Sequence, residues 1–342
     1  MAKSTMGPHA GSAGRGGDGG RAALRPRAAA APPTIAGRAR RSAALAALAL
    51  LALSASGCGF KSEPLGKLPS FPQTVRDGDG RDVRIAADPQ RIVSLDPGLT
   101  ESAFALGASS AVVAVSGHES YPPSARKRPH ALTAAGALRL RFLRSLHPDL
   151  VLASAFTSAT QAQSLSRRLS APVYVAASST LDGLLHDVLE LGIMTGRSSR
   201  GRRLAAQLRS RVGDVRAAVA SFPRRRVFVD RGFFYTIPPQ SLAADLINVA
   251  GGVDVAADAE PGQPYPPRKL RRARPQVYLA LIDSGTTLAG LARSPALRNL
   301  PAVRHHRFAV IPARTIEDSG PRAVDSLETL ARAIHPDLSL GK

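Results

Sequence analysis

Short apolar segments alternate with segments of helical spacing over residues 91–193, and this pattern predicts strands followed by helices. The apolar segments are bounded by turn residues, as buried strands commonly are. We expect strands at residues 91–95, 112–115, 148–153 and 172–175. Helical spacing follows at residues 99–106, 161–169 and 181–193. Alternating strands and helices are typical of βα units, so this part of the chain is expected to form a mostly parallel sheet.

The longest amphipathic segment runs from residue 197 to residue 221 and contains no proline. Its apolar side chains recur at steps of three and four residues, as one face of a helix requires: Leu204, Leu208, Val212, Val215 and Val219. At 1.5 Å per residue the helix would be about 37 Å long, which is enough to connect two lobes. Gly213 in its middle is expected to cost about 1 kcal/mol relative to alanine.

The alternation of strands and helices resumes after Pro223. Strands are expected at residues 227–229, 277–282 and 308–311, and helices at residues 242–249 and 322–334. Residues 146–153 also resemble residues 273–280, because in both a helix ends before proline and an apolar strand begins after it. The predicted fold class is therefore α/β, with two Rossmann-like lobes (residues 71–196 and 222–342) joined by one long helix, residues 197–221.

The beginning of the first lobe contains alternating carboxylates, Asp77-Gly78-Asp79-Gly80, between two short β-prone runs. A calcium loop would need further ligands and a closing glutamate, which do not follow. We therefore expect a hairpin turn here.

The amino-terminal segment has the composition of an export signal preceded by a disordered extension. Residues 1–37 are rich in Gly, Ala, Pro and Arg and are expected to be a disordered extension. Residues 38–57 contain arginines, then an apolar run too short to span a membrane, then small residues, which is the order of a signal peptide. The sequence ending in Cys58 resembles a bacterial lipobox, so Cys58 is expected to carry the lipid anchor and residues 58–70 to be its tether. An ordinary signal peptide with an incidental cysteine is the alternative.

Composition narrows the class of protein. The 342 residues carry 46 Lys+Arg against 25 Asp+Glu, a formal net charge of +21, and a single cysteine excludes a disulfide scaffold. A net charge of this size is also typical of basic nucleic-acid-binding proteins, which is the rival interpretation. However, 40 of the 46 basic residues are arginine, and they are spread along the chain. The export signal also argues against a partner in the cytoplasm, so we expect no nucleic acid and instead an affinity for anionic ligands or envelope surfaces.

A series of short motifs resembles the iron-siderophore/cobalamin family of ABC-transporter substrate-binding proteins. In chain order they are Pro89-Gln90-Arg91-Ile92-Val93-Ser94-Leu95, Thr100-Glu101, Leu106-Gly107, Pro148-Asp149-Leu150-Val151, Ala250-Gly251-Gly252 and Ala302-Val303. The resemblance implies a helical-backbone substrate-binding protein: two α/β lobes, one interlobe helix, a ligand in the cleft between the lobes, and delivery to a membrane permease and its ATPase. We expect a monomer that is anchored to the cell membrane outside the cytoplasm.

Candidate ligand-binding residues lie in the loops after the strands, because ligands of open α/β sheets bind at the carboxyl ends of the strands. Tyr121 lies in a Tyr-Pro-Pro loop that resembles the ligand loop of cobalamin-binding members. Phe233-Phe234-Tyr235 is the densest aromatic cluster of the chain and offers apolar faces for stacking. The expected ligand-binding residues are Asp96, His118, Tyr121, Phe156, Arg231, Phe233, Phe234, Tyr235 and Arg314, with Arg322 as a further arginine for anionic groups.

Metal and catalytic chemistry find little support in the sequence. His305 and His306 are adjacent, so their side chains diverge on a regular element, and we expect no metal site there. No nucleophile elbow, P-loop or dinucleotide fingerprint follows any strand, so we expect no enzyme and no cofactor.

The ligand class remains open between a cobalamin-like corrinoid, which the Tyr-Pro-Pro loop favours, and a ferric siderophore or haem. The family usually carries a docking glutamate on each lobe. Those positions fall near Thr160 and near Arg268-Lys269, a reversed charge, so a surface lipoprotein without a transporter is a third hypothesis.

Overall fold

The computed structural model describes residues 70–338, which lie within one compact unit, Gly66–Lys342. The expectations for the extension, the signal peptide and Cys58 therefore concern residues outside the described part. No helix among the described residues is long and apolar enough to cross a membrane.

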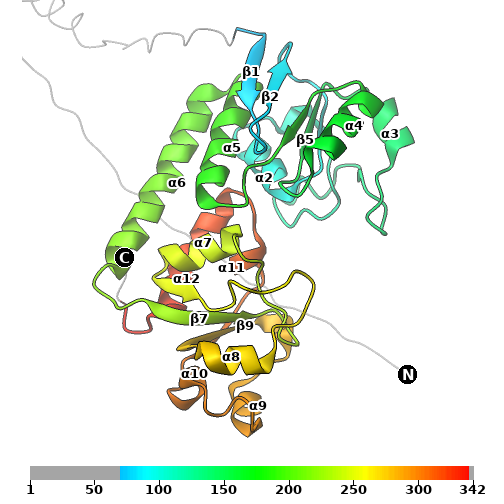
Figure 1. The fold of residues 1–342 in the computed structure, drawn as a ribbon. Coiled ribbons are helices and arrows are strands. Elements are labelled where there is room, and N and C mark those ends of the chain that lie inside the picture. Colours follow the sequence, from blue (N-terminus) through cyan, green and yellow to red (C-terminus); the bar gives the residue numbers. More distant parts are fainter. Residues whose placement is uncertain (1–69, 339–342) are drawn as a thin grey trace, which may run out of the picture. The chain divides into compact units, whose positions relative to one another are not determined.

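The first lobe is built on a parallel sheet of four short strands (Figure 1). Its order is β4-β3-β5-β6, with bounds Val112–Ala114, Ile92–Ser94, Leu150–Ala153 and Val173–Val175. Helices α2 (Pro97–Ala105), α3 (Leu140–Ser145), α4 (Ala159–Leu169) and α5 (Leu181–Met194) connect and cover the strands. Strands β3, β5 and β6 are buried along their whole length, which explains why they are continuous apolar runs.

The second lobe repeats this topology. Its sheet has the order β10-β9-β7-β8, with bounds Phe308–Ile311, Val277–Leu281, Arg225–Asp230 and Gly252–Asp254, and every neighbouring pair is parallel. In both lobes the first strand in the chain lies between the second and the third, and the fourth lies outside the third. Helices α7 (Leu242–Val249), α8 (Pro267–Ala273), α9 (Leu288–Arg293), α10 (Pro301–Arg304), α11 (Arg314–Glu317) and α12 (Leu327–Ile334) complete the lobe. The predicted fold class is confirmed, and the resemblance between residues 146–153 and 273–280 marks equivalent elements.

The long helix α6, Ser198–Val219, connects the two lobes (Figure 1). Leu208, Val212, Val215 and Val219 of its apolar stripe are buried, as the spacing predicts. Leu204 is partly buried and packs against the hydrophobic clusters of both sheets. Helix α5 lies beside α6, and the two backbones come so close that a Cβ on Gly201 would lie 3.0 Å from the carbonyl oxygen of Val188. The connection is therefore a packed helix pair rather than a single exposed rod.

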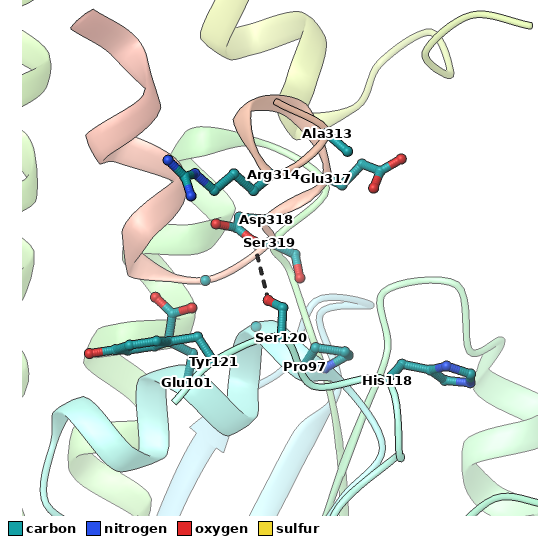
Figure 2. A pocket seen from close by; sticks show the side chains of 12 residues that line it. Pro97, Glu101, His118, Ser120, Tyr121, Ala313, Arg314, Glu317, Asp318 and Ser319 are labelled. Atoms are coloured by element: carbon teal, nitrogen blue, oxygen red, sulfur yellow. Dashed lines mark hydrogen bonds between the residues drawn. The ribbon is translucent and has the colours of Figure 1, made fainter. Parts of the chain in front are cut away.

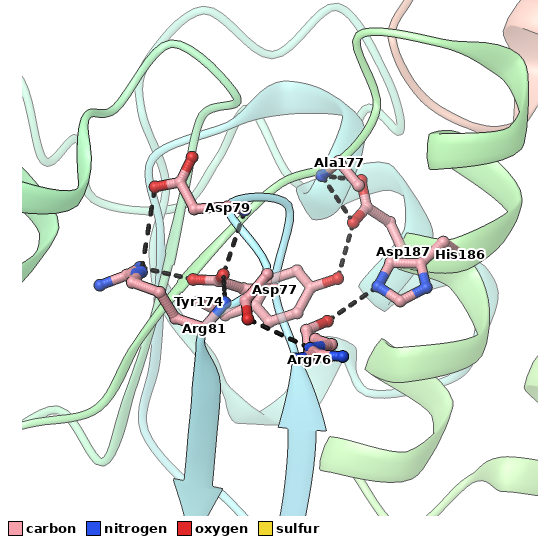
Figure 3. Close-up of polar contacts among 9 residues, drawn as sticks. Arg76, Asp77, Asp79, Arg81, Tyr174, Ala177, His186 and Asp187 are labelled. Atoms are coloured by element: carbon pink, nitrogen blue, oxygen red, sulfur yellow. Dashed lines mark hydrogen bonds and ion pairs between the residues drawn. The ribbon is translucent and has the colours of Figure 1, made fainter.

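The carboxylates of residues 77–80 form a hairpin turn between β1 (Gln73–Arg76) and β2 (Asp82–Ile85), as expected. Asp77 Oδ1 accepts hydrogen bonds from the backbone N–H groups of Asp79 (3.1 Å) and Arg81 (2.8 Å) (Figure 3). His186 of α5 bonds to the carbonyl oxygen of Arg76 at 2.8 Å, so the hairpin is fixed to the helix pair.

One predicted helix begins later than expected. Residues 322–334 were expected to be one helix, but Pro321–Ser326 form a 3₁₀ segment (η4) and the α-helix starts at Leu327. In the 3₁₀ segment Ala323 and Val324 are buried side by side, and Arg322 is bound to the other lobe, so tertiary contacts outweigh the helical periodicity. Helices α3 and α8 end shortly before Pro148 and Pro275, as the repeated pattern predicts. Helices α9, α10 and α11 and strand β8 are short and were not predicted.

Two glycines of α6 allow the close packing of α5 and α6 to be tested with a matched control. Gly201→Val should lower the free energy of unfolding by about 1–3 kcal/mol, because its side chain must displace the backbone of α5. Gly213→Val, in the same helix but with no atom within 4 Å of a Cβ, should change it by less than about 0.5 kcal/mol. Denaturant unfolding measures both, and equal losses would contradict the close packing of the two helices.

Candidate functional site

A cavity with a volume of about 530 Å³ lies between the two lobes. The first lobe contributes loops that follow β3, β5 and β6, including Asp96, Phe156 and Ser178. The second lobe contributes three segments: Arg231 in the turn directly after β7, residues 237–243, and residues 316–319. The cavity therefore lies at the carboxyl ends of strands from both sheets, where α/β proteins bind ligands.

A second cavity of about 390 Å³ continues the first (Figure 2). The two share Pro97, Glu317, Asp318 and Ser319 in their walls, so they form one elongated cleft. The additional walls come from both lobes: Gly98, Glu101, His118, Ser120 and Tyr121 on one side, and Ala313, Arg314 and Gly320 on the other.

The loop after β4 is held by the buried carboxylate of Glu119. Its Oε1 accepts hydrogen bonds from the backbone N–H (3.0 Å) and the hydroxyl (2.9 Å) of Ser116, and its Oε2 accepts one from the Gly117 N–H at 2.8 Å. Thr100 of α2 donates to the same carboxylate at 3.3 Å. Satisfying these donors fixes the loop that presents His118 and Tyr121 to the cleft.

Asp187 of α5 performs the same task for the loop after β6 (Figure 3). Its carboxylate accepts hydrogen bonds from the Ala177 N–H at 2.9 Å and from the Tyr174 hydroxyl at 2.7 Å. Burial raises the pKa of Asp187, although these bonds oppose the shift. The next residues, Ser178 and Ser179, line the larger cavity.

Asp230 at the end of β7 holds the aromatic turn of the second lobe. Its Oδ1 accepts from the backbone N–H groups of Gly232 (2.8 Å) and Phe234 (3.2 Å), and its Oδ2 accepts from the hydroxyl of Tyr278 at 2.7 Å. Phe233 and Phe234 both have positive φ angles, 51° and 63°, which are unfavourable for aromatic residues. The bonds to Asp230 keep the turn in this strained conformation.

Asp96 both caps a helix and lines the cleft. Its Oδ1 accepts the Leu99 N–H at 2.8 Å and so caps the amino terminus of α2, while the residue lines the larger cavity. Burial raises the pKa of Asp96 to about 6, partly offset by the hydrogen bond from Leu99.

A partly buried ion pair connects the lobes at one end of the cleft. Arg322 of η4 binds Glu101 of α2 twice, through its backbone N–H to Oε1 at 2.7 Å and through Nε to Oε2 at 3.0 Å. The Arg322 guanidinium also lies 4.0 Å from the ring centre of Tyr121. The backbone of Gly320 packs closely against the Glu101 side chain here, because a Cβ on Gly320 would lie 2.8 Å from Cδ of Glu101. This contact sets the separation of the lobes beside the cleft.

Two arginines at the cleft, Arg231 and Arg322, form ion pairs with carboxylates. Arg231 Nη2 lies 3.0 Å from Glu317 Oε1. Arg322 pairs with Glu101 and lies 3.5 Å from Asp318, and the charge of Arg314 also acts on the Asp318 carboxyl. Arg322, expected as a contact for ligand anions, is instead committed to the contact between the lobes.

The structure brings six of the nine expected residues into the cleft walls. Asp96, Phe156 and Arg231 line the larger cavity, and His118, Tyr121 and Arg314 line the smaller one. Phe156 is 85% exposed, so its ring is free to contact a ligand. Their part in ligand binding stays a prediction.

The three aromatic side chains of the turn at residues 233–235 do not lie together. Phe234 packs partly against the core of the second lobe, whereas Phe233 and Tyr235 are exposed and line neither of these cavities. The sequence analysis missed the apolar wall at Ile237, Pro238, Pro239, Leu242, Ala243 and Ile316, although it pointed to two of the loops that carry it. The described residues contain no group of three His, Cys, Asp or Glu suited to hold a metal ion.

Two similarly built α/β lobes with a cleft at their strand ends define a solute-binding protein. The family described as "Periplasmic binding protein" matches residues 92–315, so the chain belongs to the periplasmic binding protein family. Members of this family bind small molecules outside the cytoplasm and deliver them to ABC permeases, and they are not enzymes.

Individual relatives differ in what their names say they bind. A cobalamin-binding protein of Halobacterium salinarum is 27% identical over 281 residues, covering 78% of this chain and 75% of the relative. The uncharacterized ABC transporter substrate-binding lipoprotein YvrC of Bacillus subtilis is 25% identical over 314 residues, 87% of this chain and 98% of the relative. The structure of the periplasmic heme-binding protein RhuT from Roseiflexus sp. RS-1 in apo form superposes with a TM-score of 0.60 at 27% identity, covering 72% of this chain and 98% of that one.

The raised pKa of Asp96 predicts a pH dependence of stability. Between about pH 4 and pH 6 the unfolded chain loses the Asp96 proton while the folded chain keeps it, so stability falls as pH rises through this window. The difference corresponds to about 3 kcal/mol at pH 7. Asp96→Asn, which keeps an acceptor for Leu99, should remove this part of the fall in denaturant unfolding at pH 4 to 7. Parallel curves for the two proteins would contradict the assignment.

Proposed function

We propose that this protein binds a cobalamin-like corrinoid in the cleft between its lobes and delivers it to an ABC permease. The proposal is supported first by the cobalamin-binding relative, which matches three quarters of its own length. The observation that carries it within the structure is the pairing of Arg231 and Arg322 with carboxylates at the cleft.

Charge distinguishes the ligand classes. A ferric siderophore of the catecholate type is strongly anionic, and haem carries two propionates, so both favour a site with uncompensated cations. A corrinoid has a flat macrocycle fringed by neutral amides, which need hydrogen-bond partners and apolar surface rather than net charge. Arg231 already pairs with Glu317, and Arg322 with Glu101, so the cleft is close to electrically balanced.

The shape and lining of the cleft also suit a broad, flat ligand. The two adjoining cavities extend the space along the interface of the lobes. Ile237, Leu242 and Phe156 supply apolar surface in the walls of the larger cavity, while Ser178 and Ser179 offer hydroxyls for amide groups.

Haem binding is the second candidate, favoured by one observation. His118 and Tyr121, side chains able to ligate haem iron, both line the smaller cavity. The heme-binding protein among the similar structures gives the same alternative.

Transport requires docking to the permease. Thr160 is exposed in the first turn of α4, and Arg268 is exposed in the first turn of α8, where Lys269 pairs with Asp258 at 2.9 Å. Because these positions carry no acidic residue, a permease partner of this protein is expected to present acidic rather than basic groups to α8. Anchoring through Cys58 would place the protein on the outer face of the cell membrane.

The ligand class is tested by titrating the purified protein with cyanocobalamin, hemin and a ferric triscatecholate under identical conditions. The expected result is saturable one-to-one binding of cyanocobalamin that is at least tenfold tighter than binding of the other two. Tighter binding of hemin, or of the triscatecholate, would refute the corrinoid proposal.

A substitution locates that binding in the cleft. Phe156→Ala should weaken cyanocobalamin binding by about tenfold, since loss of a stacked aromatic ring costs on the order of 1 kcal/mol beyond its buried area. Val310→Ala, at an exposed apolar residue of β10 outside both cavities, is the control and should change the affinity less than twofold. Equal effects of the two substitutions would place the ligand elsewhere.

A further inference from the structure

Another cavity, lined by polar residues, lies in the second lobe. It is found at the amino ends of the strands, whereas the cleft lies at their carboxyl ends. Its volume is about 380 Å³. Its basic walls come from residues at the starts of β7, β9 and β10: Arg225 and Arg226, then Arg274, then Arg304, His305 and Arg307. The cleft residues Arg231 and Arg314 instead follow the carboxyl ends of β7 and β10. The two sites therefore lie at opposite ends of the strands of this sheet, of which β7 and β9 are labelled in Figure 1.

The positive charge of this cavity is not balanced. Gln276, Asn299 and Pro301 complete its walls, so no carboxylate lines it. Within residues 70–338, none of its five arginines has an acidic partner within 4.0 Å, in contrast to Arg231 and Arg322 at the cleft. Five guanidinium groups around one small cavity repel each other, and an anion bound there would relieve that repulsion.

The first lobe provides an internal comparison. Asp149 precedes β5 and occupies the position equivalent to Gln276 before β9 in the repeated topology. Asp149 accepts hydrogen bonds from the backbone N–H groups of Gln90 (2.7 Å) and Arg91 (2.9 Å). Gln276 Oε1 accepts the equivalent bond from Arg226 at 3.0 Å, but as a neutral amide. The second lobe thus keeps the structural bond while omitting the carboxylate that would neutralise its arginines.

One of these arginines, Arg226, is also held in a defined position. Arg226 Nε donates to the backbone carbonyl oxygen of Arg274 at 3.0 Å, which fixes one guanidinium at the rim of the cavity. Guanidinium groups are planar donors whose geometry matches the oxygens of phosphate.

We propose that this cavity binds a phosphate group, supplied either by a free phosphate or diphosphate or by the headgroup of an anionic phospholipid. Both sources present the same doubly or singly charged oxygen cluster, and the cavity is large enough for one such group. The site is separate from the cleft, so the proposal does not depend on the identity of the transported ligand.

The test compares the full chain with two variants that lose equal charge. The cavity variant is Arg226→Gln/Arg274→Gln/Arg304→Gln, three exposed arginines. The control is Arg268→Gln/Arg271→Gln/Arg272→Gln, three arginines of α8 that line none of the cavities described above. Because all three proteins share the same amino-terminal segment, differences between them report on the second lobe.

Diphosphate binding is measured by calorimetry, and vesicle binding by co-sedimentation with phosphatidylcholine vesicles with and without phosphatidylglycerol. The expected result is that the cavity variant loses at least tenfold in affinity for diphosphate or for the phosphatidylglycerol vesicles, while the control loses less than twofold. Loss with diphosphate identifies a free phosphate as the source, and loss with the anionic vesicles alone identifies the lipid headgroup. Equal losses in both variants, or no saturable binding of either probe by the unmodified chain, would overturn the proposal.

A single substitution guards against misfolding of the triple variant. Arg304→Glu changes one exposed residue of the short helix α10 and reverses its charge. It should weaken binding of the same probe at least tenfold while leaving the thermal melting temperature within about two degrees of the unmodified chain. Unchanged binding would count against the cavity.

Discussion

Buried carboxylates determine how the cleft of this protein is built. Loops that border an open cleft have few neighbours to satisfy their backbone N–H groups, and an unpaired buried donor is costly. Glu119, Asp187 and Asp230 each accept at least one backbone hydrogen bond from such a loop, and Asp96 accepts one from the first turn of α2. These carboxylates hold the walls in place without filling the space between them, so the cleft is preformed. The cost is the burial of charged groups, which appears as the raised pKa of Asp96 and Asp187.

Charge is distributed differently at the two ends of the second lobe. At the cleft, Arg231 and Arg322 are paired with Glu317 and Glu101. At the opposite end, five arginines surround a cavity without any carboxylate in its walls. A high net charge alone does not distinguish these cases, because only the partners of each arginine decide whether it attracts an anion. The balanced end suits a neutral macrocycle, and the unbalanced end suits a phosphate group.

Much of the fold was predictable because its elements have strong periodicities. The buried strands are continuous apolar runs, and the α6 stripe is regular over its whole length. The exception, Pro321–Ser326, follows from the contact of Arg322 with Glu101, which are 221 residues apart and carry no mark of their pairing in the sequence. Local periodicity does not register such long-range contacts.

The candidate site was predictable at the level of loops rather than of side chains. Strand ends indicate which loops gather at the cleft, and six of the expected residues lie in its walls. In the aromatic turn, however, positive φ angles direct Phe234 toward the core and leave Phe233 outside both cavities. Backbone conformations of this kind depend on the bonds to Asp230, which spacing in the sequence does not reveal.

The most direct test of this account is a crystal structure of the protein with cyanocobalamin. The account predicts the corrin ring between Phe156 and the wall at residues 237–243, with Arg322 still bound to Glu101. Density for the ligand outside the cleft, or a cleft in which Arg322 has left Glu101 to bind the ligand, would contradict it.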